Sequence, residues 1–167
     1  MSSIQSLLET MDKLSEAHEA LFELAQEKTQ PLVRNDVDKL NMIVNKENKW
    51  IRLITEANQQ RIQLISAYLI SRGYNPNPKI TVSDLTKVIF KAEEKTALIE
   101  AQRKLLEIIK RLKERNVINQ QLIEQSLAFI DYTVDLVLGG PEDNMVYQHP
   151  NQQAYGTKRM GIFDTKA

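Results

Sequence analysis

Cysteine is absent from this chain of 167 residues. Without it the protein can form no disulfide, bind no zinc through thiolates and use no thiol as a nucleophile, and its composition suits a reducing compartment. No stretch approaches the ~18 consecutive apolar residues that a membrane-spanning helix needs. The N-terminal residues also lack the basic segment and apolar core of a secretory signal. We therefore expect a soluble, cytoplasmic protein.

An excess of charge of either sign is absent as well, because 22 lysine and arginine residues balance 22 aspartate and glutamate residues. Binding to nucleic acid rests on many cationic contacts with phosphates, and binding to anionic lipid rests on clustered basic residues. The sequence contains no such cluster. Neither nucleic acid nor a membrane surface is therefore an expected partner.

Glycine and proline are scarce, with five of each, and none lies between Lys79 and Leu138. Nothing in that run breaks a helix, and its apolar residues recur three and four positions apart, so the pattern predicts helix over most of it. A helix of this length has more apolar surface than one small globule can bury. Part of that surface is therefore expected to meet another long helix or another chain.

The prolines and glycines that are present divide the chain. Pro31 is expected to end a first helix or to open the next one, because proline is tolerated only in the first turn of a helix. Asn35 or Asp36 then offers a side-chain oxygen to cap a second helix. Gly73 to Pro78 is the clearest linker. The long helices are predicted over about Ser3–Gln30, Asp36–Ser71 and Glu93–Leu138.

A short helical segment is predicted before the last long helix. Thr81 or Ser83 can cap its first turn, and Asp84 is favourable at the positive end of a helix. The segment is expected over about Asp84–Phe90, and whether it is a helix separate from the last one stays open. The polar stretch from Lys91 to Thr96 is the expected place of a kink or break.

Together these features predict an all-α fold, an elongated antiparallel hairpin or coiled-coil bundle of about three long helices. The economical arrangement pairs the second helix with the last and lays the first alongside. Residues 1–139 would form this helical domain. Residues 140–167 contain glycine, proline and spaced aromatic residues without a helical period, so a flexible C-terminal tail is predicted there.

The residue patterns of enzymes and cofactor sites are largely missing. The adjacent glycines Gly139 and Gly140 follow a helix end, whereas a phosphate-binding loop precedes a helix. His18 and His149 lie in different contexts and cannot form a metal site unaided. A lone histidine on an amphipathic helix is typical of phosphotransfer domains, but His18 lacks the neighbouring lysine and glycine of such sites, so a packing role is favoured. We expect no enzyme, cofactor or metal.

Two amides, Asn116 and Asn119, interrupt the apolar positions of the last helix. Buried amides cost stability unless they are paired, and they often set the register between helices. A register role, or solvent exposure near the end of the hairpin, is favoured over contact with a client protein, which stays open.

Beyond these amides the last helix is more apolar than a two-helix contact requires. The surplus can be covered by the first helix or by a second copy of the chain. It can equally be a docking surface for an amphipathic helix of a client, recognised through anchors three and four positions apart. The set comprises Leu122, Ile123, Leu127, Phe129, Ile130, Val134, Val137 and Leu138.

In these residues the chain resembles the FlgN family of flagellar export chaperones. The resemblance rests on Asn116-x-x-Asn-Gln-x-Leu-Ile-x-Gln-Ser-Leu-x-Phe-Ile130, which is followed by an apolar stretch ending in Leu-Gly. Glu47 and Arg61 in the second helix, Ser83-Asp-Leu, and the closing Gly161-Ile-Phe-Asp-x-Lys-Ala167 also match. The similarity covers nearly the whole chain, and the order and spacing of these motifs make it specific.

The resemblance implies a cytoplasmic chaperone for the first and third hook-associated proteins, which form the hook–filament junction. Members of the family prevent premature assembly of these subunits and help to deliver them to the flagellar type III export gate. Their client-binding surface lies toward the C-terminus. The resemblance therefore places client binding on Leu122, Ile123, Leu127, Ile130, Val134, Leu138, Tyr155 and Phe163. The alternative is a structural coiled-coil scaffold, with the same surface sealed in a permanent homodimer.

Overall fold

The computed structural model describes residues 2–75 and 79–138, and every element in them is an α-helix. The prediction of an all-α fold is confirmed, whereas the predicted tail at 140–167 lies outside the described residues. The chain divides into two compact units, Met1–Ser126 and Leu127–Ala167, and the boundary falls within the last helix. The helices are α1, Ser3–Arg34; α2, Val37–Ser71; α3, Val82–Thr86; and α4, Ala92–Leu138.

Helix α1 continues through Pro31, so its predicted end near Gln30 is wrong. Proline in the last turn removes only one intrahelical hydrogen bond, and the ring of Pro31 is buried, so the helix runs on to Arg34. Asn35 then takes a left-handed backbone conformation (φ 54°), which asparagine tolerates better than most residues. The next amide, that of Asp36, donates to the Pro31 carbonyl at 2.9 Å. The turn into α2 is therefore tight.

Helix α2 begins and ends with the capping groups that the sequence predicts. The Asp36 carboxylate accepts a hydrogen bond from the Lys39 amide at 3.1 Å. At the other end, Gly73 has φ 81°, and its amide donates to the Ile70 carbonyl while the Tyr74 amide donates to Leu69. A Cβ on Gly73 would meet no atom within 4 Å, so glycine is favoured there by its backbone conformation alone.

The short helix α3 is present but spans Val82–Thr86, earlier and shorter than predicted. Thr81 Oγ1 accepts from the Asp84 amide, and the Asp84 carboxylate accepts from the Thr81 amide, each at 3.2 Å. These hydrogen bonds from Thr81, with Lys87 nearby, lower the pKa of Asp84. The break covers residues 87–91, so it lies mainly before the stretch from Lys91 to Thr96 where it was predicted, and α4 starts at Ala92.

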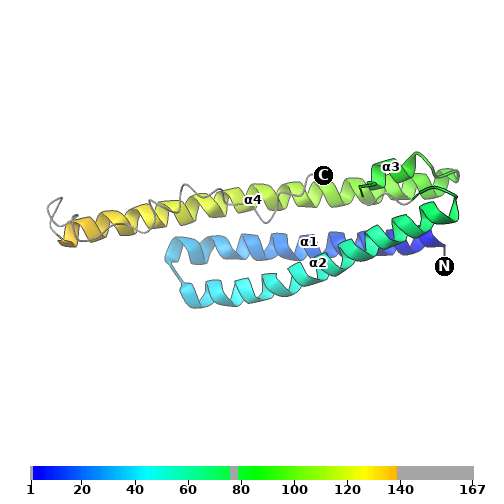
Figure 1. Ribbon diagram of the computed structural model, residues 1–167. Coiled ribbons are helices and arrows are strands. Elements are labelled where there is room, and N and C mark those ends of the chain that lie inside the picture. The colour runs from blue at the N-terminus through cyan, green and yellow to red at the C-terminus, as the bar shows by residue number, and fades with distance from the viewer. Residues whose placement is uncertain (1, 76–78, 139–167) are drawn as a thin grey trace. The chain divides into compact units, whose positions relative to one another are not determined.

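Within Met1–Ser126, α1 and α2 form an antiparallel hairpin and approach one another most closely (Figure 1). The expected pairing of the second and last helices differs from this arrangement. The α1–α2 contact includes an ion pair of 2.5 Å between Lys28 and Glu47, both largely shielded from solvent. The two helices are consecutive and are joined by a tight turn, so bringing them together costs little conformational entropy. The first part of α4 lies along the hairpin and runs parallel to α1 (Figure 1).

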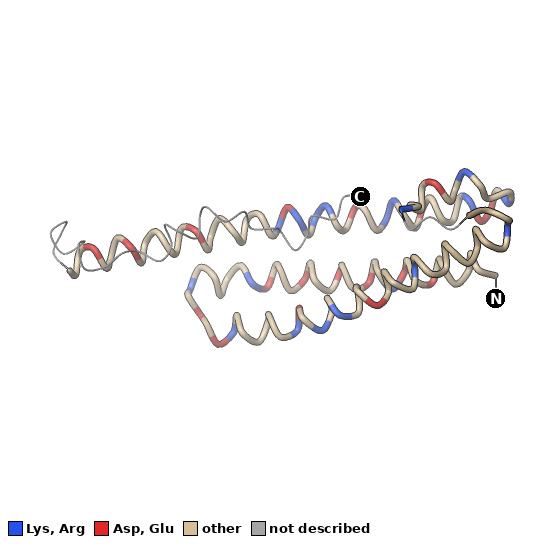
Figure 2. Tube along the Cα trace, in the orientation of Figure 1, with Lys and Arg blue, Asp and Glu red and all other residues tan. Residues whose placement is uncertain are grey.

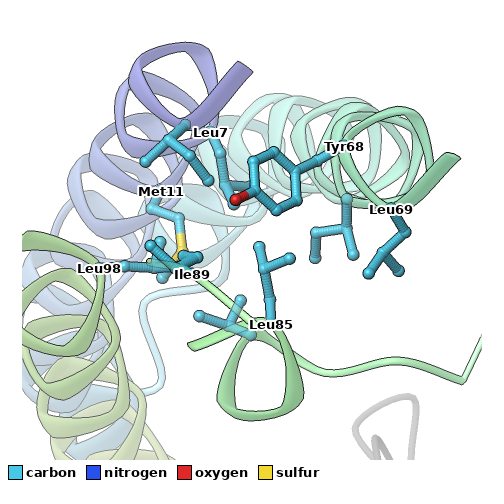
Figure 3. Packing of buried hydrophobic residues seen from close by; sticks show 10 residues of the cluster. Leu7, Met11, Tyr68, Leu69, Leu85, Ile89 and Leu98 are labelled. Carbon is cyan, nitrogen blue, oxygen red and sulfur yellow. The ribbon is translucent and has the colours of Figure 1, made fainter. Parts of the chain in front are cut away.

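The core lies where all four helices meet, and α3 closes it. Leu85 of α3 is completely buried, and it packs among side chains from α1, α2 and α4 (Figure 3). A second, smaller cluster joins Leu21 and Ala25 of α1 to Leu112 of α4, with Trp50 of α2 packed against it. The first cluster contains Ile4, Leu7, Met11, Ile65, Tyr68, Leu69, Val82, Leu85, Ile89 and Leu98.

One polar atom in the first cluster lacks a partner. Tyr68 is only 5 % exposed, and its hydroxyl forms no hydrogen bond, although the Arg72 guanidinium lies 5.3 Å from the centre of its ring. A buried hydroxyl without a partner costs roughly 1–3 kcal/mol. The ring therefore stabilises the core, and the hydroxyl opposes it.

We expect Tyr68→Phe to raise the free energy of unfolding by about 1 kcal/mol, because it removes the unpaired hydroxyl and keeps the ring beside Arg72. Urea unfolding followed by circular dichroism measures the change. Leu85→Ala in the same cluster is the comparison and should lose about 2–5 kcal/mol. A loss of stability in Tyr68→Phe would contradict the interpretation.

Candidate functional site

The register between α1 and α4 determines how far α4 is covered. Thr29 of α1 contacts Asn119, 90 positions along the chain. The buried clusters join the same two helices, since one contains Leu7, Met11 and Leu98 and the other contains Leu21, Ala25 and Leu112. Helix α1 ends at Arg34, and at this offset its last residue lies level with about Glu124 of α4. Leu122 and Ile123 are the two predicted client-binding residues that lie in Met1–Ser126, and both are half-buried.

The last turns of α4, in the unit Leu127–Ala167, are exposed throughout, apart from a half-buried Asp131. The exposed fraction of the side chains is 40 % at Leu127 and Val134, 48 % at Ile130 and 52 % at Leu138. We call these four residues the first face. Their separations of three, four and seven positions place them on one side of the helix. The two further predicted residues, Tyr155 and Phe163, lie outside the described residues.

An open hollow of about 290 Å³ lies at the C-terminal end of the first face. Its lining consists of Thr133, Val134, Val137 and Leu138. Val137 is 79 % exposed and shares this side of the helix, although the predicted set of client-binding residues omits it. The residues that line it extend the exposed apolar surface of the first face.

A second group of exposed apolar residues was not recognised as a unit from the sequence. Phe129, Tyr132 and Leu136 are between 61 % and 66 % exposed. They are separated by three, four and seven positions, and at ~100° per residue they lie on roughly the opposite side of the helix from the first face. We call them the second face. The separation of Phe129, Tyr132 and Leu136 by three and four positions could have revealed the second face. In the sequence these residues alternate with those of the first face.

The charges of this segment are all negative. From Asn116 to Leu138 the charged residues are Glu124, Asp131 and Asp135, with no lysine or arginine. Figure 2 shows acidic but no basic positions along this part of α4. At ~100° per residue, Asp135 lies between the two faces, whereas Asp131 lies beside Leu127 and Leu138 of the first face. The segment therefore offers apolar contacts beside a negative edge.

Of the two amides, the structure buries Asn119 and leaves Asn116 half-exposed. The Asn119 amide nitrogen donates to the Ala25 carbonyl at 2.8 Å, and its oxygen accepts from the Thr29 hydroxyl at 2.8 Å. Both partners belong to α1. This pair of hydrogen bonds favours the register role of Asn119, because only one offset of the two helices can form them.

His18 is half-buried in α1, and its Nδ1 lies 2.6 Å from the Leu14 carbonyl. A carbonyl only accepts hydrogen bonds, so the ring carries a proton on Nδ1 and donates it there. Burial lowers the pKa of His18, and the hydrogen bond to Leu14 opposes that shift. These contacts fit the packing role.

The part of the chain that the structure describes holds no group of three or more potential metal-ligating side chains. None of its four helices combines the length and the apolar character that crossing a bilayer requires. What the described residues of α4 offer is a surface for contact with another polypeptide.

Comparison with known proteins shows what the whole chain is similar to. The family described as FlgN protein matches residues 1–154. The uncharacterized protein YvyG of Bacillus subtilis (strain 168) is 32 % identical over 167 residues, which cover 99 % of each chain. No solved structure matches the chain.

We expect Asn119→Ala to lower the free energy of unfolding by about 1–3 kcal/mol, because it leaves the Ala25 carbonyl and the Thr29 hydroxyl without their buried partner. Asn116→Ala is the matched control. It removes the same side chain from a half-exposed position, where it forms no hydrogen bond with the described residues, and should cost less than about 0.5 kcal/mol. Urea unfolding measures both, and equal losses would contradict the register role.

Stability should also depend on His18 as the pH falls. Because the folded state lowers the pKa of His18, the unfolded state binds the proton more readily. The stability contributed by the neutral ring is complete above the ordinary value of 6.5 and is lost as the pH falls below it. His18→Gln should therefore lose less stability than the wild type between about pH 7 and pH 5, as urea midpoints would show. Equal losses would disprove this.

Proposed function

The chain belongs to the FlgN family of flagellar export chaperones, and from this membership we propose that it is a cytoplasmic type III export chaperone. Its clients are the first and third hook-associated proteins, the subunits of the hook–filament junction. The chaperone binds their helical terminal segments, prevents premature assembly and aids delivery to the export gate. This function involves no bond-breaking step, cofactor or metal.

The observation that supports this proposal is the exposed first face. Leu127, Ile130, Val134 and Leu138 present anchors at the spacing by which one amphipathic helix recognises another. Masking a client segment requires a helical apolar surface that stays accessible until the client arrives. In the unit Leu127–Ala167 the described residues provide such a surface.

The size of the first face indicates how the client is held. Full burial of a leucine, isoleucine or valine side chain contributes roughly 1.5–3 kcal/mol, so four half-exposed side chains contribute roughly 3–6 kcal/mol. Association alone costs about 4–15 kcal/mol. The first face therefore needs help from further contacts, and we include Leu122, Ile123, Tyr155 and Phe163 in the proposed client surface. A modest net affinity suits a chaperone that must release its client for export.

The double variant Ile130→Asp/Val134→Asp should weaken binding of the purified first hook-associated protein by at least about tenfold, because two carboxylates would have to be buried against apolar anchors. Isothermal titration calorimetry measures the affinity, and far-ultraviolet circular dichroism should show unchanged helix content. Val117→Asp is the matched control. Val117 is exposed on α4 within Met1–Ser126, so its replacement should change the affinity by less than about twofold.

Unchanged client binding in the double variant would contradict the assignment of the first face to the client-binding site.

Light scattering across a dilution series addresses the alternative of a structural scaffold. A homodimer that persists on dilution and is not displaced by the client would favour the scaffold, whereas a monomer, or a dimer that the client displaces, supports the chaperone.

A further inference from the structure

Residues 79–91, which we call the α3 segment, are ordered by the apolar side chains that they bury. Helix α3 has five residues, fewer than the ~12 at which an isolated helix becomes even marginally stable. Its order therefore comes from Val82, Leu85 and Ile89, which are all buried in the first cluster. In Figure 3, Leu85 and Ile89 lie among side chains of the three long helices. The α3 segment thus depends on the long helices for its structure.

The hydrogen bonds that shape α3 join residues of the segment to one another. Thr81 and Asp84 bond each other through their side chains and amides, and Thr86 Oγ1 donates to the Ser83 carbonyl at 2.6 Å. These bonds can persist if the segment moves as a unit. The Gln102 side chain of α4 donates to Ser83 Oγ at 2.7 Å, but this bond is exposed, so water can replace it. For these residues, moving the segment away costs little hydrogen bonding.

Helices α1, α2 and α4 have contacts of their own that do not involve the α3 segment. The second buried cluster is built from these three helices alone. The hydrogen bonds of Asn119 join α4 to α1, and the ion pair of Lys28 and Glu47 joins α1 to α2. Parts of a protein that share few contacts with the rest can open as separate cooperative units. The α3 segment has the properties of such a unit.

Arg72, the residue that caps the C-terminus of α2, contacts the α3 segment through an aromatic ring. Its guanidinium lies 5.3 Å from the centre of the Tyr68 ring and 6.0 Å from the centre of the Phe90 ring. Tyr68 is buried in the first cluster, whereas Phe90 is 83 % exposed and lies in the break between α3 and α4. The faces of aromatic rings attract a guanidinium. Arg72 therefore joins a buried ring of α2 to an exposed ring of the α3 segment.

We propose that the α3 segment is a lid, which opens while α1, α2 and α4 stay folded, and that Arg72 holds it closed through Tyr68 and Phe90. Opening uncovers apolar side chains of the first cluster, among them Leu69 and Leu98. The inference goes beyond the proposed function, because it involves none of the residues assigned to the client. Its test also requires no client.

The absence of cysteine makes a single introduced thiol a specific reporter of opening. Thr86→Cys places a thiol in the lid, and Ala57→Cys places one in α2, at positions that are both 8 % exposed. Excess of a chromogenic disulfide reagent, added to the full chain, measures how often each thiol becomes accessible. We expect the thiol of Thr86→Cys to react at least about tenfold faster than that of Ala57→Cys. Equal rates would show that the lid opens only with the rest, and would overturn the proposal.

A substitution away from the lid separates the two kinds of opening. Ile108 is a buried residue of α4 outside both clusters. Ile108→Val should speed labelling of Ala57→Cys by about two- to tenfold, because it destabilises the packing of the long helices. It should change labelling of Thr86→Cys by less than about twofold. Equal acceleration of the two thiols would contradict independent opening of the lid.

The role of Arg72 is tested in the Thr86→Cys background. Arg72→Gln should speed labelling by about two- to fivefold, because it removes the cation from both rings. Lys95→Gln is the matched control, since Lys95 is an exposed cation that forms no ion pair with the described residues, and it should change the rate by less than about 1.5-fold.

Phe90→Leu should also speed labelling of Thr86→Cys. Combined with Arg72→Gln, it should give less than the product of the two single effects, because both remove the same contact. An unchanged rate in Arg72→Gln, or effects that simply multiply, would overturn the assignment of Arg72.

Discussion

The register between α1 and α4 is the constraint on which the rest of the molecule depends. The two helices run parallel from the same end of the bundle, but α1 has 32 residues and α4 has 47. The buried Asn119, with its two hydrogen bonds to α1, holds the offset near the place where α1 ends. Because the amide is expensive to bury in any other register, it fixes how α1 and α4 align within Met1–Ser126.

The exposed end of α4 is kept in solution by its charge and composition. Its apolar side chains are divided between two faces, and Asp135 lies between them. The division limits the size of each continuous apolar patch, and the common negative charge opposes self-association. These properties suit the client-binding surface proposed above, which has to stay accessible before the client binds.

Much of the fold and part of the site could be predicted from sequence. The caps at Asp36, Gly73 and Thr81 act within a few residues, so their effect does not depend on the rest of the molecule. The end of α1 was predicted wrongly at Pro31, because burial of the proline ring, which the sequence does not reveal, outweighed the loss of one hydrogen bond. Asn116 and Asn119 looked equivalent, and only the packing of α1 showed which of them is buried. The second face was missed because its spacing is interleaved with that of the first.

What the sequence by itself determined is that the chain is helical, roughly where its long helices begin, and that its last helix carries more apolar residues than one contact needs. Those properties follow from local hydrogen bonding and from the helical period. Only the tertiary structure decided which helices pair, where the cover provided by α1 runs out, and which side of α4 faces water. These depend on contacts between residues some ninety positions apart, which no local pattern encodes.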